Sequence, residues 1–289
     1  MRTLSDALQQ RVLLADGSLS RQLRAQTFSV DRDLFGVEDC LEVLNVTRAK
    51  LVREAHLAYL RAGADVIRTN SLGASPLSLR EKGLGEQAFY FNYAAAQIAC
   101  EAVDAVPGRG RRRFVLGIVR DFGWDENPKT LESAVGLQVE GLLAGGVDGV
   151  ALDLVPGTGR APFFLRGALK AKASLKAAAP IFLQCGLTEN DFSPRNQELA
   201  NGLVRFAPGK SLRAERLAQV IREDRINLVG GGSRPEDTLA LDHLLRAEAE
   251  DSLRPYGAVW RAEGVERGVE EVTIPSSCLD LDPAVAEVC

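Results

Sequence analysis

The chain has 289 residues, 46% of them hydrophobic, which is enough to bury the core of one large α/β domain or of two small ones. Its formal charge of −4 and its pI near 5.5 exclude the basic surface of a typical nucleic-acid-binding protein. On that charge we expect no nucleic acid as a partner. We also expect no membrane, because no apolar stretch reaches the ~20 residues that span a bilayer.

The cysteines also bear on the setting in which the protein works. They are odd in number and scattered, without a CxxC motif: Cys40, Cys100, Cys185, Cys278 and Cys289. The first residues lack the apolar core of a signal peptide. Both observations favour a reduced, cytoplasmic setting. The dense basic run at residues 109–113 is typical of a solvated loop.

The first predicted element is a buried strand at residues 12–17, which ends in Asp16 and Gly17. A strand that ends in an acid and a glycine is the expected start of a β/α barrel, because the strand ends of that fold carry the site. Residues 20–45 are polar and irregular in pattern, so we expect a connection there.

The stretch 45–75 contains a complete helix–strand unit. Thr47 is a candidate N-cap, and apolar side chains recur at helical spacing as far as Gly63, which suits the left-handed position after a last helical turn. Residues 64–70 have the pattern of a short buried strand, and residues 71–75 that of a polar turn. This order predicts the repeating unit of a parallel sheet.

The remaining chain repeats this alternation. Strands are predicted at 114–119, 148–153, 179–185, 225–229 and 256–260, with a further candidate at 271–274, and helices at 86–106, 131–144, 163–176 and 212–222. Residues 188–210 have a loop-like pattern, and residues 235–237 suit the first turn of a helix. The alternation predicts a single (β/α)8 TIM-barrel domain over residues 1–289, with irregular or incomplete closure at the C-terminal strands.

The unit at 45–75 carries a family resemblance. It contains, in order, Asn45 and Thr47, His56 and Tyr59, the run 62–65 and the strand end 69–71. This pattern resembles the homocysteine S-methyltransferase family, which includes betaine–homocysteine methyltransferase and the N-terminal module of cobalamin-dependent methionine synthase. The segment 138–148 followed by Asp153 is similar to a second signature of that family, whose strand normally ends Glu-Thr and here ends Asp153-Leu154.

The resemblance implies a zinc-dependent reaction. In that family three cysteine thiolates hold the metal, which deprotonates the sulfur of homocysteine, and a methyl donor such as methyl-cobalamin, betaine or S-methylmethionine then reacts with it. Activation matters because a free thiol has a pKa near ~8.5 and only its thiolate is reactive. The ligands come from a Gly-x-Asn-Cys motif at a late strand and a Gly-Gly-Cys-Cys-Gly motif at the last one.

This chain departs from those motifs, and two alignments are open. In the first, residues 229–233 stand for the paired-cysteine motif and Cys185 for the single cysteine. In the second, residues 226–231 are the Gly-x-Asn-Cys strand, and residues 260–264 belong to the seventh strand. Spacing from Asp16 and helix order favour the second. Under either alignment the three-cysteine site cannot be assembled, so we expect a degenerate member with no zinc and no other cofactor.

Other metal ligands are poor substitutes. His56 lies on the apolar face of its helix and His243 on a helix after the strand at 225–229, so both are expected to be structural or solvated. Cys185, at a predicted strand end, is either a ligand or nucleophile or a buried structural residue, and the structural role is favoured. Cys278 and Cys289 lie in the tail, whose role stays open.

Polar strand ends remain as the candidate substrate-binding set: Asp16, Asn70, Asp153, Gly230 and Gly231. The resemblance implies that Asp16 and Asp153 hold the amino group of the substrate. Strand-end acids also cap helices or bind loop amides, so that alternative stays open. The glycines at 230–232 can either cradle an anion or form a tight turn.

Two classes of function follow. One is a methyltransferase-like protein of methionine metabolism that binds homocysteine or another small thiol, with altered or reduced activity. The other is a non-catalytic descendant, a binding or interaction protein that acts with a partner subunit. A weaker third option moves methyl groups to or from a corrinoid protein without thiolate activation.

Overall fold

The computed structural model describes residues 3–106, 111–155, 158–185, 203–208, 226–230 and 232–251. For Cys185, 203–208 and 247–251 this description covers the backbone alone. All of these residues belong to one compact unit of the chain, residues 1–258. A single domain over the whole chain stays a prediction. Among the described helices, none has both the length and the apolar character that a bilayer crossing requires.

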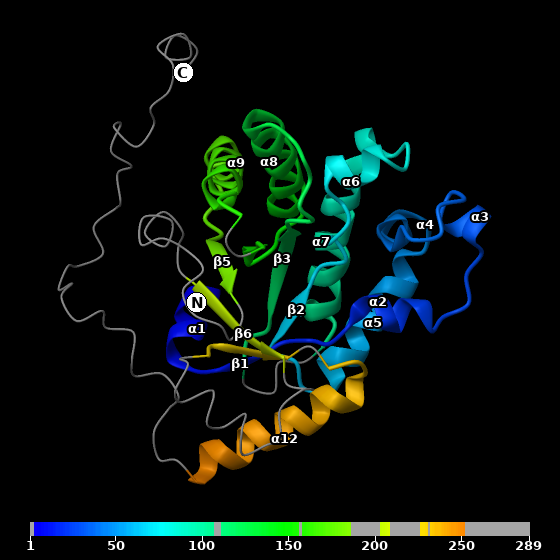
Figure 1. Ribbon diagram of the computed structural model, residues 1–289. Coiled ribbons are helices and arrows are strands. Elements are labelled where there is room, and N and C mark those ends of the chain that lie inside the picture. Colours follow the sequence, from blue (N-terminus) through cyan, green and yellow to red (C-terminus); the bar gives the residue numbers. More distant parts are fainter. Residues whose placement is uncertain are drawn as a thin grey trace, which may run out of the picture. The chain divides into compact units, whose positions relative to one another are not determined.

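The described strands are all parallel and follow one another around a ring (Figure 1). Their order is β1-β7-β6-β5-β4-β3-β2. The bounds are β1 Leu13–Leu14, β2 Val66–Arg68, β3 Phe114–Arg120, β4 Gly149–Asp153, β5 Ile181–Cys185, β6 Leu203–Pro208 and β7 Leu228–Gly230. The two ends of this order, β1 and β2, meet through a one-residue parallel bridge between Ala15 and Val66. The architecture is that of a TIM barrel, with seven strands within the described residues.

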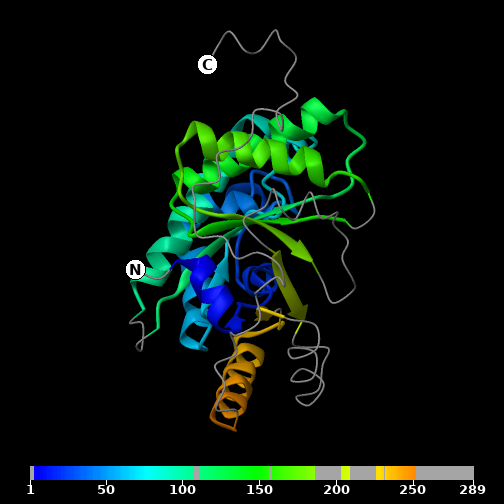
Figure 2. The same cartoon turned by 90° about the vertical axis from the view of Figure 1, so that its left-hand side faces the viewer.

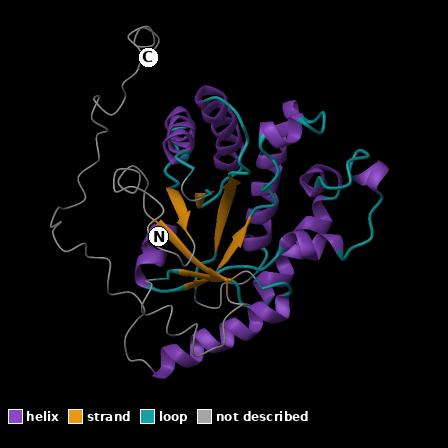
Figure 3. Cartoon of the chain, in the orientation of Figure 1, coloured by secondary structure: helices purple, strands orange, loops and turns teal. Residues whose placement is uncertain are grey.

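Helices cover the outside of the strands (Figures 2 and 3). The α-helices are α1 Leu4–Gln10, α2 Leu19–Arg24, α3 Val30–Asp33, α4 Leu44–Thr47, α5 Ala49–Arg61, α6 Pro76–Arg80, α7 Ala88–Asp104, α8 Pro128–Ala144, α9 Ala161–Ser174 and α12 Pro235–Asp251, and the 3₁₀ helices are η1 Leu41–Val43 and η2 Gly85–Gln87. Helices α5, α7, α8 and α9 pack against one another in chain order. Successive helices of the chain are therefore neighbours in the outer layer, as expected of successive β/α units.

The strands bury both faces, which explains their continuous apolar runs. Side chains of β3 alternate between two cores: Phe114, Leu116 and Ile118 fill the inside of the ring, whereas Val115 and Val119 pack against the helices. Helix α1 closes the inner core with Leu4 and Leu8, among others. Its first turn carries a capping box between Thr3 and Asp6.

Several predicted boundaries are confirmed to within a few residues, whereas other predictions are wrong. Helix α5 begins at Ala49, and Thr47 does not cap it, because its hydroxyl donates to the carbonyl oxygens of Asp33 and Val43. The connection at 20–45 contains short helices instead of irregular chain. The segment 188–210 contains strand β6, whose sequence LVRFAP is interrupted by an arginine and ends in a proline, so its strand pattern is weak.

The strand at 225–229 is the seventh along the ring and not the sixth. It is hydrogen-bonded directly to β1, since the Leu13 amide donates to the Asn227 carbonyl at 2.9 Å and the Ala15 amide to that of Val229 at 2.6 Å. A strand beside β1 is the last one of a barrel. This pairing contradicts the second alignment and agrees with the first. The strands predicted at 256–260 and 271–274 and the helix at 212–222 lie outside the described residues.

The contact between β1 and β2 is short in backbone terms and is flanked by two ion pairs. On the side where the strands begin, Arg11 donates to both carboxylate oxygens of Asp65 at 2.7 and 3.0 Å, and Asp65 also accepts the amide N–H of Leu14. On the side where they end, Arg68 of β2 donates to Asp16 at 2.8 Å. Both carboxylates are buried, so the ring closes through charged side chains as well as through backbone bonds.

We expect the Asp65→Ala substitution to lower the free energy of unfolding by about 3 kcal/mol, because it leaves Arg11 and the Leu14 amide without their buried acceptor. Chemical denaturation measures the change. Glu54→Ala is the matched control, since Glu54 forms only exposed pairs with Arg53 and Arg61 and its loss should cost at most about 0.5 kcal/mol. Equal losses in the two variants would show that the pair does not hold the ring closed.

Candidate functional site

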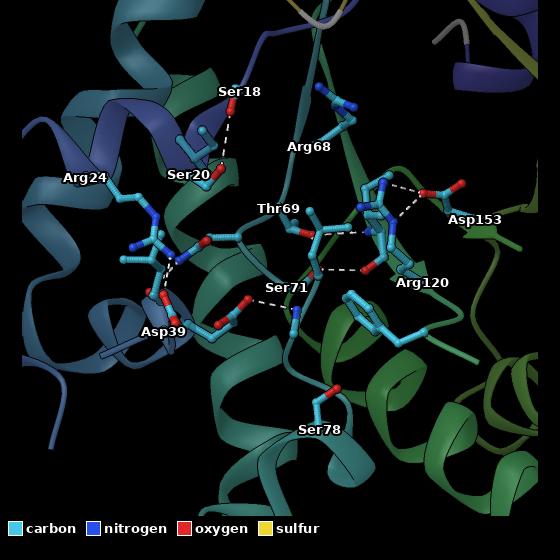
Figure 4. A pocket seen from close by; sticks show the side chains of 18 of the residues that line it. Ser18, Ser20, Arg24, Asp39, Arg68, Thr69, Ser71, Ser78, Arg120 and Asp153 are labelled. Atoms are coloured by element: carbon cyan, nitrogen blue, oxygen red, sulfur yellow. Dashed lines mark hydrogen bonds and ion pairs between the residues drawn. The ribbon is translucent and has the colours of Figure 1, made fainter. Parts of the chain in front are cut away.

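A cleft of about 850 Å³ opens at the carboxyl ends of the strands (Figure 4). It is lined by strand-end residues and by the loops that follow β1 and β2. The lining contains acidic and basic residues in similar number. The acidic residues are Asp16, Asp39, Glu42, Glu81 and Asp153, and the basic residues are Arg24, Arg68, Lys82 and Arg120. The cleft is therefore suited to a small ligand that carries both charges.

Asp16 lies in the cleft wall and is fully buried. Its carboxylate accepts hydrogen bonds from the backbone N–H of Arg68 at 3.0 Å and from Nε of Arg68 at 2.8 Å. The same guanidinium donates to the carbonyl oxygens of Asp16 and Gly17. Burial raises the pKa of Asp16, and the charge and hydrogen bonds of Arg68 oppose that rise. The predicted site residue Asp16 thus cross-links two strand ends.

Asp153 lies at the end of β4, and its partner is Arg120 of β3. Nε and Nη2 of Arg120 contact the same carboxylate oxygen, Oδ2, at 2.7 and 2.6 Å (Figure 4). The two residues are also register partners, and Asp153 is in turn the register partner of Gln184 on β5. Arg120, Asp153 and Gln184 therefore form a row across three neighbouring strand ends that lines the cleft.

The loop after β2 is held by a buried network of hydroxyls and amides. Thr69 and Ser71 share a 2.7 Å hydrogen bond, and the hydroxyl of Ser71 donates to the Ile118 carbonyl. The side-chain amide of Asn70 donates to the Leu41 carbonyl and to Oδ1 of Asn45. Asn70 lines the cleft, but the two N–H groups of its amide serve the loop.

The glycine turn is packed tightly against the first strand. A Cβ atom on Gly230 would lie 2.7 Å from the Cβ and the carbonyl oxygen of Ala15, and one on Gly232 would lie 2.5 Å from the Cβ of Asp237. The amides of Ser233 and Arg234 donate to Asp237. Gly230 therefore allows close contact between β7 and β1. Gly231 lies outside the described residues, and its predicted role stays a prediction.

The described sulfur and imidazole groups are not among the residues that line the cleft. Cys40 and Cys100 belong to the helical layer, and burial raises the pKa of each thiol to about 11. His56 is buried in α5 and His243 is exposed on α12. Within the described residues, no group of three His, Cys, Asp or Glu side chains is placed to hold a metal ion. The structure does not describe Cys278, Cys289 or the side chain of Cys185.

Sequence patterns missed the basic residues of the cleft and Gln184. Arg68, Arg120 and Gln184 stand at or next to strand ends, as the predicted acids do, and that position is the signal that could have indicated them. An aromatic pair at the rim was also missed: Phe122 is 51% exposed and contacts Trp124 edge to face at 5.5 Å between ring centres. Both aromatic residues follow β3 and line the cleft.

The structural role of His56 can be tested through the pH dependence of the free energy of unfolding. Both ring nitrogens are buried without a hydrogen-bond partner among the described residues, and burial lowers its pKa to about 4, against about 6.5 in an unfolded chain. Between about pH 6.5 and pH 4, His56 is therefore protonated in the unfolded chain and neutral in the folded chain. We expect the free energy of unfolding to fall by roughly 3 kcal/mol as the pH falls from about 6.5 to about 4.

Denaturation at several pH values measures this loss. The His56→Leu variant should lack this part of the acid sensitivity, whereas His243→Leu, which changes an exposed histidine, should keep it. The same acid sensitivity in all three proteins would contradict the assignment.

Known proteins are similar to this chain in sequence and in fold. Residues 13–206 match the family model described as homocysteine S-methyltransferase. Methionine synthase from Mycobacterium tuberculosis is 34% identical over 114 residues, 39% of this chain and 10% of that protein, and methionine synthase from Mycobacterium leprae is 26% identical over 211 residues, 71% of this chain and 17% of that protein. The chain thus spans less than a fifth of the length of these relatives.

Among solved structures, the metallated form of the homocysteine methyltransferase MmuM from Escherichia coli superposes with a TM-score of 0.59. The superposition covers 81% of this chain and 96% of that chain, at 21% sequence identity. At this identity the likeness shows a shared fold.

Proposed function

Because this chain belongs to the homocysteine S-methyltransferase family, we propose that it binds homocysteine or another small thiol in the cleft at the carboxyl ends of its strands, without the three-cysteine zinc site of the family. The proposed binding residues are Asp16, Asn70, Asp153, Gly230 and Gly231. The observation that carries the proposal is the mixed charge of the cleft, which suits the ammonium and carboxylate groups of an amino acid.

The described residues at the cleft do not fit a zinc ion. Strand β7 is the last strand of the ring, where the paired-cysteine motif of the family belongs, and it ends in glycine. Side chains at Gly230 and Gly232 would collide with Ala15 and Asp237. We therefore derive no step of the reaction through zinc.

Without a metal, the reactivity of a bound thiol is set by the fraction of it that is ionised to thiolate. The guanidinium groups of Arg68 and Arg120 favour a thiolate, but each is paired with a carboxylate, so their effect on a neighbouring sulfur is largely cancelled. Methyl transfer in this cleft should accordingly be slow. The protein then contributes by placing the thiol beside the loops of the cleft, where a methyl donor can approach it.

The same observation favours a second candidate function. The two acids that the family resemblance assigns to the substrate amino group, Asp16 and Asp153, are each engaged by an arginine. A cleft whose acids are already paired is also expected in a non-catalytic binding protein that acts with a partner subunit. The measurements below separate the two candidates.

We expect the purified full chain to contain well under one zinc ion per molecule and to bind L-homocysteine in the presence of a chelator, because the described residues that line its cleft include no cysteine. Elemental analysis and calorimetry in EDTA measure the two quantities. Stoichiometric zinc whose removal abolishes binding would contradict the proposal. Metal-free protein that binds no homocysteine would favour the non-catalytic alternative.

We expect any methyl transfer from S-methylmethionine to homocysteine to become about tenfold faster per pH unit below the thiol pKa of ~8.5, because only the thiolate reacts. Product formation between about pH 6 and 8, with and without chelator, measures this dependence. A rate that is flat over this range would require an activating group that the proposal lacks. No turnover at any pH would again favour the binding protein.

A further inference from the structure

The two ion pairs at the strand ends of the cleft expose their arginines more than their acids. The side chain of Arg120 is 43% exposed and that of its partner Asp153 is 21% exposed. In the second pair the exposed fractions are 22% for Arg68 and 1% for Asp16. All four residues line the cleft. Each pair as a whole is neutral, so a ligand is recognised through the atoms that it can touch, and the guanidinium groups offer more of these than the carboxylates do.

Arg120 has one edge of its guanidinium group unused. Its Nε and Nη2 atoms both contact Oδ2 of Asp153, and its Nη1 atom has no partner among the described residues. The two residues are register partners on β3 and β4, so the pair is fixed to the strand ends. Arginine stays protonated and only donates hydrogen bonds, and its planar fork matches a carboxylate best. The unused edge is therefore complementary to an acidic group of a ligand.

The acids of the same two pairs offer little to an amine. Oδ1 of Asp16 accepts from Nε of Arg68, and Oδ2 accepts from the Arg68 backbone N–H, so both oxygens of this buried carboxylate are engaged. Oδ1 of Asp153 accepts no hydrogen bond from the described residues, but an ammonium group placed there would lie beside the positive charge of Arg120. An amino group thus gains little at these strand ends.

The other acidic residues of the lining belong to a different part of the cleft. Three of them line it without lying at a strand end: Asp39, Glu42 and Glu81. Asp39 is paired with Arg24, and Figure 4 shows this pair on the side of Thr69 opposite to Arg120. The mixed charge of the whole cleft is therefore unevenly distributed, with Arg120 apart from the exposed acids.

We propose that the cleft selects acidic thiols, whose carboxylate group is bound by Arg120 in the orientation set by Asp153, and that an α-amino group adds little affinity. The inference rests on the proposed function, because it takes the cleft to be a thiol site. It narrows the substrate class to mercapto carboxylic acids, of which homocysteine is only one. It also gives Asp153 a positioning role in place of the amino-group contact that the family resemblance implies.

Calorimetry on the full chain in metal-free buffer tests the proposal with homocysteine and its fragments. 4-Mercaptobutanoate keeps the thiol and the carboxylate but lacks the amine, whereas 3-mercaptopropylamine keeps the thiol and the amine but lacks the carboxylate. Butanoate has the carboxylate alone. The comparison therefore separates the contributions of the three groups.

The variants change one charge at a time. Arg120→Gln removes the positive charge, Arg120→Lys keeps it, and Asp153→Asn removes the negative charge. Arg112→Gln is the matched control, because Arg112 pairs with Asp148 before the same two strands begin, with side-chain exposures of 44% and 21% that match the cleft pair. Neither Arg112 nor Asp148 lines the cleft. Thermal unfolding of each variant is recorded alongside.

Wild-type protein should bind 4-mercaptobutanoate at least as tightly as homocysteine, and 3-mercaptopropylamine at least about tenfold more weakly. Arg120→Gln should weaken both carboxylates about tenfold and leave the amine probe unchanged, and Arg120→Lys should bind the carboxylates more tightly than Arg120→Gln. Asp153→Asn should bind 4-mercaptobutanoate about threefold more tightly than wild type, because its amide oxygen still accepts from Arg120 while the negative charge is gone. Arg112→Gln should bind every probe as wild type does, whatever its Tm.

Other results overturn the inference in distinguishable ways. Homocysteine bound about tenfold more tightly than 4-mercaptobutanoate, or 3-mercaptopropylamine bound as tightly as either, would refute acid selection and leave thiol binding in place. Unchanged affinity in Arg120→Gln, or an equal loss in Arg112→Gln, would refute the role of Arg120. An Asp153→Asn variant that binds either carboxylate more weakly than wild type would refute the positioning role, and a loss confined to homocysteine would assign Asp153 to the amino group.

Two further outcomes bear on the proposed function itself. Binding of none of the three thiols would refute the proposed function and the inference with it. Binding of butanoate as tight as that of 4-mercaptobutanoate, and dependent on Arg120, would support the acid site while removing the thiol from the proposed function.

Discussion

The closure of the strand ring between β1 and β2 is the constraint on which the rest of this structure depends. Parallel strands gain stability from long ladders of backbone hydrogen bonds, but β1 has only two residues, and its contact with β2 is a single bridge. The chain compensates with buried Asp–Arg pairs on either side of that bridge, Arg11 with Asp65 and Arg68 with Asp16. Each carboxylate also accepts a backbone N–H, so the charges are well satisfied despite burial.

The pair on the cleft side links architecture to function. Asp16 occupies the position that a family resemblance assigns to substrate recognition, yet here its carboxylate and backbone carbonyl hold Arg68 in place. Further along the ring, β3, β4 and β5 form longer ladders, and the buried Oε1 atom of Gln184 has no hydrogen-bond partner among the described residues. At the closing contact, by contrast, the buried carboxylate of Asp16 is engaged by Arg68.

The glycine turn after β7 illustrates the same competition. The Gly232 carbonyl accepts the Ser18 amide, and a Cβ on Gly17 would lie 2.2 Å from that carbonyl oxygen. The first and last strand ends are therefore in contact through bare backbone. A Cβ at Gly230 would need Ala15 of the first strand to move, and a Cβ at Gly232 would need Asp237 to move.

The sequence by itself determined the succession of β/α units as far as β5, the family, and the strand-end location of Asp16 and Asp153. These follow from side-chain periodicity and local motifs, which record burial and turn geometry within a few residues. Only the tertiary structure decided that β6 exists, that β7 adjoins β1, and that Asp16 and Asp153 are each paired with an arginine. The Asp16–Arg68 pair joins residues 52 positions apart, and no local pattern records which distant side chain will share a buried charge or leave an acceptor such as Oε1 of Gln184 without a partner.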